Sequence, residues 1–318
     1  MNGGFDFEKP ILELEAKIEG LKKLSEEQQV DVSSEIASLQ KKLDRAQKET
    51  YSNLTPWQRV QIARHPQRPY TLDYIRLMME GFIELAGDRL FANDLAIVAG
   101  LARMDGRTLA VIGHQKGRDT KENLMRNFGS AHPEGYRKAQ RIMKMAEKFK
   151  FPVVSFIDTP GAYPGIGAEE RGQAEAIASN LRTMAVLQTP IVVVIIGEGG
   201  SGGALGIAVG DEVMMLENCY YSVISPEGCA AILWKNQGKA AEAASTLRIS
   251  PKELLELGVI DRIIPEPLGG AHGNYELAAG EVKRALAESL DRLTRIPVEE
   301  LVSARYEKYR AMGSFAEG

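Results

Sequence analysis

The chain has 318 residues, of which 44% are hydrophobic and 26% are charged, and its formal net charge is -4. These values are typical of a soluble globular protein with a full core, and the negative balance argues against nucleic acid as the main partner. The sequence contains no apolar run near the roughly 18–20 residues of a membrane span and no basic-then-apolar N-terminal signal. We therefore expect a cytoplasmic protein that contacts no membrane.

Residues 10–48 are predicted to form a helical hairpin, since apolar side chains recur three and four residues apart in both halves. Gly20 and the polar stretch 25–31 are expected to form its turn. Each arm is too short for an independent coiled coil. The hairpin must therefore pack on a partner subunit or on the protein's own core.

A basic segment follows a well-marked helix start. Thr55 is placed to cap a helix, with Pro56 in the first helical position and Gln58 three residues after the cap. The cationic residues that come next are Arg59, Arg64, His65 and Arg68. Their side chains could meet a phosphate-bearing substrate or an acidic partner, or form an ordinary solvated surface.

The next elements alternate in type. A helix is predicted from Thr71 to about Leu85, and two strands are joined around Asp105-Gly106, a strong hairpin signal. The polar, basic stretch 114–132 has little periodicity, and loops of that length are usually functional. The strands are expected at 95–103 and 108–113, and the helix after the loop at 133–150.

Two consecutive segments repeat the pattern of a buried strand, a glycine-rich loop and a helix. The strands cover 152–157 and 191–196; we call residues 158–167 the first glycine loop and residues 197–203 the second. Strands joined by a helix are normally parallel, so both loops should leave the same edge of the sheet. Their backbone N–H groups could then face one cavity, which would suit negative charge.

The rest of the chain continues an α/β pattern. Cys219 and Cys229 fit no zinc spacing, and we expect both to be reduced packing residues and the chain to hold no metal. The other predicted elements are a helix at 168–187, short strands at 213–216, 220–224 and 259–264, helices that begin at Ser225 and Ser250, and two helices within 275–312.

The second glycine loop matches several motifs weakly. Gly197, Gly199 and Gly202 have the spacing of a dinucleotide fingerprint, but the helix that follows is too short for a usual strand–helix–strand unit. The phosphate-loop pattern fails because no Lys-Ser/Thr pair follows Gly202. Close packing alone could also require the glycines.

Two catalytic interpretations remain. Ser201 stands in a Gly-x-Ser-x-Gly pattern typical of the nucleophile of a serine hydrolase, with His272 downstream. The carboxylates that could complete a triad are Asp211, Glu217, Glu227 and Asp261. Because there are so many candidates, their presence neither favours nor excludes a triad. The second interpretation needs no nucleophile: N–H donors at the starts of two helices form an oxyanion hole, each worth roughly 2.7–4 kcal/mol where charge develops.

Long stretches of the chain resemble the alpha subunit of the carboxyltransferase of bacterial-type acetyl-CoA carboxylase. Two of them are Phe156-Ile-Asp-Thr-Pro-Gly-Ala-Tyr-Pro-Gly165 and Ile196-Gly-Glu-Gly-Gly-Ser-Gly-Gly-Ala-Leu205. The others are residues 63–74, 112–118, 132–138, 221–229 and 264–272. The resemblance covers nearly the whole chain.

This resemblance implies a crotonase-like α/β fold of repeated ββα turns, with an N-terminal helical hairpin at 1–54, the carboxyltransferase core at 55–273 and C-terminal helices at 274–318. It implies transfer of a carboxyl group from carboxybiotin to acetyl-CoA, giving malonyl-CoA for fatty-acid biosynthesis. Biotin would be attached to a biotin carboxyl carrier protein and not to this chain. The other expected partners are biotin carboxylase and a zinc-ribbon beta subunit, in an alpha2beta2 complex without which the chain is inactive.

By the same resemblance, this chain should hold the ureido oxygen of biotin. We predict the N–H groups of Gly202 and Gly203 as donors, with Gly161 and Ala162 facing them from the first glycine loop. The other residues predicted to bind ligands are Gly199, Gly200, Ser201, Tyr163, Lys116, Arg118 and Arg137. No side-chain base is proposed, since the ureido group itself could take the proton.

Overall fold

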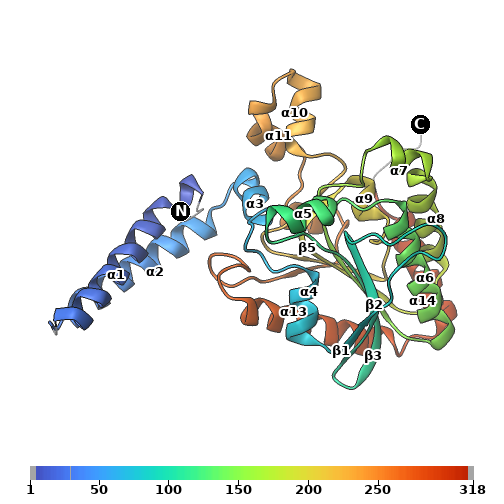
Figure 1. Cartoon of the computed structure of the whole chain (residues 1–318), viewed down its shortest axis with the longest axis horizontal. Helices are drawn as coiled ribbons and strands as arrows, with labels where there is room; N and C mark the ends of the chain where they lie inside the picture. The colour runs from blue at the N-terminus through green and yellow to red at the C-terminus, as the bar shows by residue number, and fades with distance from the viewer. Residues whose placement is uncertain (1–4, 29, 314–318) are drawn as a thin grey trace.

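The structure, a computed structural model, describes residues 5–28 and 30–313. Within these residues an eight-stranded sheet has the order β1-β2-β3-β4-β5-β6-β8, and β7 pairs with β5 beside that path (Figure 1). The strands are β1 (Glu80–Glu84), β2 (Ile97–Met104), β3 (Arg107–His114), β4 (Val153–Thr159), β5 (Ile191–Gly200), β6 (Glu212–Leu216), β7 (Tyr220–Ser222) and β8 (Arg262–Ile264).

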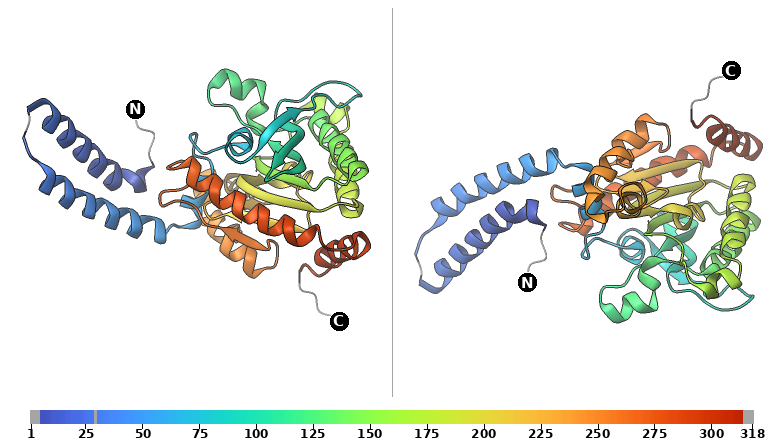
Figure 2. Two further views of the ribbon diagram at one scale, coloured as in Figure 1. Left: turned by 90° about the horizontal axis from the view of Figure 1, so that it is seen from below. Right: turned by 90° about the horizontal axis from the view of Figure 1, so that it is seen from above.

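Helices flank this sheet (Figure 2). Helix α6 packs on β2, β3 and α8, while α13 packs on α4, β5 and β8. The α-helices are α1 (Lys9–Gln28), α2 (Ser33–Ser52), α3 (Pro56–Ala63), α4 (Thr71–Met78), α5 (Thr120–Met125), α6 (Pro133–Phe149), α7 (Ile166–Glu170), α8 (Gln173–Val186), α9 (Ser201–Leu205), α10 (Pro226–Trp234), α11 (Ala240–Thr246), α12 (Pro251–Glu256), α13 (Tyr275–Leu293) and α14 (Val298–Arg310). Short 3-10 turns occur at Asp6–Glu8, Asn127–Gly129 and Gln237–Lys239.

The two predicted apolar strands are the centre of the core. Every residue of β4 and β5 is buried, as expected for parallel strands covered on both faces. The two strands pair in parallel, with Val153 opposite Ile191. The predicted hairpin is also confirmed: β2 and β3 pair antiparallel, and the turn residues Asp105 and Gly106 have φ of +51° and +77°.

The N-terminal helical hairpin is confirmed and extends as an arm away from the sheet (Figures 1 and 2). Its two helices bury Ile11, Ile18 and Leu43 against each other. The turn differs from the prediction, because Gly20 lies inside α1. Residue 29, within the predicted turn, lies outside the described residues. The division into units 1–54, 55–273 and 274–318 stays a prediction.

Two predicted helices were wrong in detail. The helix predicted for 71–85 ends at Met78, and the chain continues as β1, in which Ile83 pairs with Leu101 of β2. The helix predicted for 168–187 is interrupted, since Gly172 has a left-handed φ of +81° between α7 and α8. The stretch 114–132 is not all loop: it contains α5 and a 3-10 turn.

Candidate active site

Both glycine loops leave the same edge of the sheet, as predicted, because β4 and β5 are parallel neighbours. The loops touch each other directly. A Cβ atom added at Gly203 would lie 2.3 Å from the backbone nitrogen of Ala162, so no side chain fits there. A Cβ at Gly200 would lie 2.2 Å from the carbonyl oxygen of Pro160. These glycines therefore allow two backbone segments to approach within contact distance.

The N–H groups at this contact are not equivalent. Gly202 and Gly203 lie in the first turn of α9, where a helix has no internal acceptors for its N–H groups. Apart from bonds inside a single helix or strand, the described residues contain no hydrogen bond from the N–H of Ala162, Gly202 or Gly203. The N–H of Gly161 differs, because it donates to Thr159 Oγ1 at 3.1 Å.

Gly202 is the open position of the second glycine loop. A Cβ added there would come no closer than 3.8 Å to another atom, the Cδ1 of Ile177. Gly199 and Gly200 are the last residues of β5 and pair with Tyr221 and Ser222 of β7. The structure thus places the predicted donors at the loop contact, while their use by a ligand stays a prediction.

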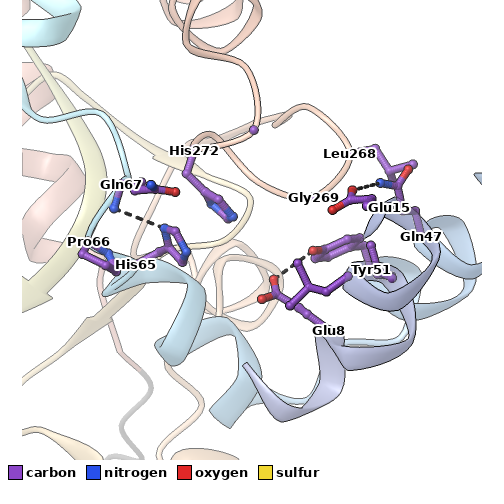
Figure 3. Close-up of a pocket in the computed structure, with 13 residues that line it drawn as sticks. Glu8, Glu15, Gln47, Tyr51, His65, Pro66, Gln67, Leu268, Gly269 and His272 are labelled. Carbon is purple, nitrogen blue, oxygen red and sulfur yellow. Dashed lines mark hydrogen bonds between the residues drawn. The ribbon is translucent and has the colours of Figure 1, made fainter. Parts of the chain in front are cut away.

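Ser201 is exposed and has a φ of +51°. It lines a largely apolar cavity of about 380 Å³. His272 lies elsewhere: its ring stacks on His65 with 3.8 Å between ring centres, in a separate pocket between the arm and the loop segments 65–67 and 268–273 (Figure 3). Burial lowers the pKa of His272 to about 4. The described structure therefore does not assemble a Ser201–His272 pair.

A buried polar cluster lies directly behind the two glycine loops. Lys116 Nζ is 2.7 Å from Asp158 Oδ1 and 2.8 Å from Glu198 Oε1. The second oxygen of Glu198 accepts hydrogen bonds from Arg64 Nε and from the hydroxyl of Tyr220, both at 2.7 Å. The surrounding cations lower the pKa of Glu198 to about 2 despite its burial. This carboxylate is therefore ionised at neutral pH.

The solvated-surface interpretation of the basic segment is wrong for Arg68. Its side chain is 1% exposed, and its guanidinium pairs with the buried carboxylate of Glu266. Its Nε also donates to the carbonyl oxygen of Ile196, at 2.6 Å. The charge of Arg64 is likewise paired within the chain, with Glu198 and Glu227. Arg64 therefore contacts the second glycine loop at Glu198, and Arg68 contacts β5 at Ile196, one residue before that loop.

The other predicted cations also have internal partners. Arg118 pairs with Asp73 and lies 3.9 Å over the ring of Tyr70. Arg137 pairs with Asp88 at 2.8 Å and with Glu134 at 3.1 Å. Their contact with a ligand stays a prediction, as does that of Lys116.

Tyr163 stacks on His132, with 4.1 Å between ring centres. The His132 ring in turn contacts Asp94 Oδ2, at 3.2 Å. The Tyr163 backbone N–H donates to the carbonyl oxygen of Ala131, at 3.0 Å. These contacts fix the outer part of the first glycine loop, and they leave a role of Tyr163 in ligand binding as a prediction.

Sequence reasoning missed Asp158, Glu198 and Tyr220 as members of this site. One signal was available, because Asp158 and Glu198 each stand within otherwise apolar or glycine-rich sequence at a strand end, where an ionised group needs a partner. Their partner, Lys116, lies 42 and 82 residues away and could not be paired from spacing alone.

Both cysteines are buried and unpaired. Burial raises the pKa of the Cys219 thiol, which accepts a hydrogen bond from Arg68 at 3.2 Å. Within residues 5–28 and 30–313, no cluster of three or more His, Cys, Asp and Glu side chains could hold a metal ion. Over the same residues, no helix is both long and apolar enough to span a bilayer.

The fold and the two adjoining glycine loops are those of a crotonase-like α/β protein. The chain belongs to the acetyl co-enzyme A carboxylase carboxyltransferase-like family, whose model matches residues 4–313. It is 58% identical to the acetyl-coenzyme A carboxylase carboxyl transferase subunit alpha of Azoarcus sp., over 98% of this chain and 97% of that one. The identity to the protein of the same name from Cupriavidus necator is 59%, with the same coverage.

Solved structures show the same fold at low sequence identity. A transcarboxylase 12S chain with hydrolysed methylmalonyl-coenzyme A bound superposes with a TM-score of 0.57 at 17% identity, over 79% of this chain and 44% of that one. This chain thus spans less than half of the transcarboxylase chain. A Pseudomonas malonate decarboxylase hetero-tetramer in complex with coenzyme A gives a TM-score of 0.56 at 15% identity, over 67% of this chain and 84% of that one.

Proposed function

We propose that this chain is the alpha subunit of an acetyl-CoA carboxylase carboxyltransferase, and that it takes part in moving a carboxyl group from biotin to acetyl-CoA to give malonyl-CoA. The main support is identity of 57–59% to curated alpha subunits over 98% of the chain. The geometry agrees, because the two glycine loops meet at one strand edge. Among the described residues, the N–H groups of Ala162, Gly202 and Gly203 have no hydrogen-bond acceptor outside their own elements.

The donors suit an oxygen that becomes negative only during the reaction. Backbone N–H groups carry no net charge and do not change protonation state, so they stabilise a developing oxyanion more than a neutral ground state. We assign this role to Gly202 and Gly203, with Ala162 and Gly161 lining the facing side. Because Gly161 N–H already binds Thr159 Oγ1, it is the weakest donor of the four.

Biotin, delivered on its carrier protein, would supply the carboxyl group. The chain's own residues would hold the ureido oxygen at Gly202 and Gly203 and would exclude water from it. The apolar cavity beside Ser201 lies next to these donors and is formed in part by Leu205 and Tyr221. An apolar wall of this kind strengthens hydrogen bonds to a developing charge.

We further propose that the chain works in the cytoplasm with a zinc-ribbon beta subunit, in an alpha2beta2 complex, together with biotin carboxylase and the biotin carboxyl carrier protein. Three observations support a partner: family membership, the arm that extends from the sheet, and the exposed apolar side chains of α10, namely Ile232 and Leu233. The beta subunit would supply most of the acyl-CoA contacts.

The test combines this chain with a co-expressed beta subunit and measures malonyl-CoA-dependent carboxylation of free biotin. We expect activity in the complex and none in the isolated chain. Gly202→Val should abolish activity, because the valine side chain would occupy the space in front of the proposed donors. The complex should still assemble, because a Cβ atom at this position meets no protein atom closer than 3.8 Å. Full activity in an assembled Gly202→Val complex would show that this position is not an oxyanion donor.

A further inference from the structure

Lys116 forms a bridge between the two glycine loops. It lies two residues beyond β3, while Asp158 is in β4 and Glu198 is in β5, so three neighbouring strands send one charged residue each to the same edge. The side chains of Lys116, Asp158 and Glu198 are 12%, 2% and 8% exposed. We call these three residues the Lys116 bridge.

The bridge determines how the loops sit relative to each other. Asp158 begins the first glycine loop and Glu198 lies inside the second, so a single ammonium group holds both. A backbone bond reinforces it, because the N–H of Glu198 donates to Asp158 Oδ1 at 3.0 Å. Movement of either loop would break charge-assisted hydrogen bonds in a buried setting, where they are strongest.

The bridge lies close in sequence to the proposed donors. Glu198 precedes Gly202 by four residues, and Asp158 precedes Ala162 by four. Between them Gly203 and Ala162 are in backbone contact. A shift of the carboxylates is therefore passed on to the N–H groups, because the loops have no spare room to absorb it.

Asp158 depends on the lysine more than Glu198 does. Among the described residues, the Asp158 carboxylate has two hydrogen-bond donors, Lys116 Nζ and the N–H of Glu198. Glu198 would retain Arg64 and Tyr220, but Asp158 would be a buried anion beside a second anion. Such a group protonates or moves toward water.

We propose that Lys116 is a positioning residue for carboxyl transfer: it sets the distance between the two glycine loops and hence the aim of the oxyanion donors. This inference rests on the proposed function, because it needs a reaction that uses both loops. The stretch 114–132 contains Lys116 and also packs against its side chain at Gly129. Gly129 of that stretch leaves room for the lysine stem, since a Cβ there would lie 2.9 Å from Lys116 Cγ.

The test replaces Lys116 with methionine in the complex with the beta subunit. Lys138→Met is the matched control, because Lys138 is also a buried lysine. Its partners among the described residues are Asn93, Asp94 and Glu84, and none of them is in a glycine loop. We expect Lys116→Met to lower kcat on the order of 10²-fold, as misplaced reacting groups do, with KM nearly unchanged. Lys138→Met should lower the melting temperature without this loss of kcat.

Hydrogen–deuterium exchange gives a readout that needs no activity. In the isolated chain, Lys116→Met should speed amide exchange in residues 158–162 and 197–203, whereas Lys138→Met should leave both segments as in the wild type. Unchanged exchange in these segments, or wild-type kcat in an assembled Lys116→Met complex, would overturn the proposal. An inactive wild-type complex would instead contradict the proposed function, and the exchange result would still decide the role of Lys116.

Lys116→Arg distinguishes an effect of Lys116 on loop position from an effect on the stability of the fold alone. It also provides a test if Lys116→Met does not fold. The longer guanidinium keeps the charge but changes the spacing. We expect the melting temperature to recover while kcat stays reduced. Joint recovery of stability and kcat would show that Lys116 only neutralises buried charge.

Discussion

Arg305 in α14 binds Asp211 with two parallel contacts, Nε to Oδ1 and Nη2 to Oδ2, each 2.8 Å long. The arginine side chain is fully buried and also donates to the carbonyl oxygens of Met184, Leu187 and Thr189. Asp211 in turn accepts the N–H of Ile191, the first residue of β5. This pair therefore fastens the C-terminal helix to the strand that leads into the second glycine loop.

Replacing Arg305 with methionine should destabilise the fold strongly. The change leaves the Asp211 carboxylate buried without its cation, which typically costs about 3–5 kcal/mol. Urea unfolding of the isolated chain measures this loss. Arg310→Met is the control: its pair with Glu307 is 3.7 Å long and exposed, and such pairs contribute roughly 0–1 kcal/mol. Equal losses in both variants would contradict our account of the pair.

Gly203→Ala should disrupt the site and lower stability together. The added methyl group would lie 2.3 Å from the backbone nitrogen of Ala162, so one loop must move. Overpacking of this kind costs about 1–3 kcal/mol, and displaced donors should lower kcat on the order of 10²-fold. Calorimetry and the biotin carboxylation assay measure the two effects.

The control for this glycine is Gly280, which lies exposed in α13 with no atom within 4 Å of an added Cβ. Gly280→Ala should stabilise the chain by roughly 0.5–1 kcal/mol, because alanine favours helix, and should leave kcat unchanged. A Gly203→Ala variant that behaves like Gly280→Ala would show that the loops can separate freely.

The strands and the glycine loops could be predicted because their signals are local. Six apolar residues from Ile191 to Ile196 can only be buried, and glycines at a strand end permit close approach. The short strand β1 could not be predicted in the same way. Phe82 and Leu85 continue the helical spacing of α4. The segment is extended because it pairs with β2, which comes later in the sequence.

The polar cluster behind the loops depends on tertiary structure alone. The family resemblance predicts Lys116 as a ligand-binding cation, but the sequence does not show that two distant carboxylates meet it. The same holds for Arg68, which sits in a basic segment but is buried against Glu266. Charge in a sequence does not reveal which side chains fold inward.

The isolated chain should not react with a fluorophosphonate probe at Ser201. No histidine contacts this serine among the described residues, since His272 stacks on His65 in another pocket. Without a general base, a serine hydroxyl is a weak nucleophile. Gel fluorescence after labelling tests this, with a serine hydrolase as the positive control. Labelling that Ser201→Ala removes would restore the hydrolase interpretation.

His114, the last residue of β3, should make the fold sensitive to acid. Its side chain is fully buried and lies beside the backbone of Phe156 and Gly203. Burial, with a smaller effect of the Lys116 ammonium, lowers its pKa to about 3, although Asp94 and the backbone of Gly203 and Phe156 act in the opposite direction. In the unfolded chain the imidazole titrates near about 6.5, so the unfolded state binds the proton first.

Stability should therefore fall as the pH drops from about 6.5 toward 3, and His114→Phe should remove part of that fall. The measurement compares the free energy of unfolding in urea at pH about 7.5 and about 5 for both proteins. We expect a smaller difference in the variant, because phenylalanine has the ring without the titrating group. Between pH about 7.5 and 8.5, His114 is neutral in both the folded and the unfolded chain, so the free energy of unfolding should depend on pH in the same way in the two proteins. An unchanged difference between pH about 7.5 and 5 would mean that His114 gains its proton without unfolding.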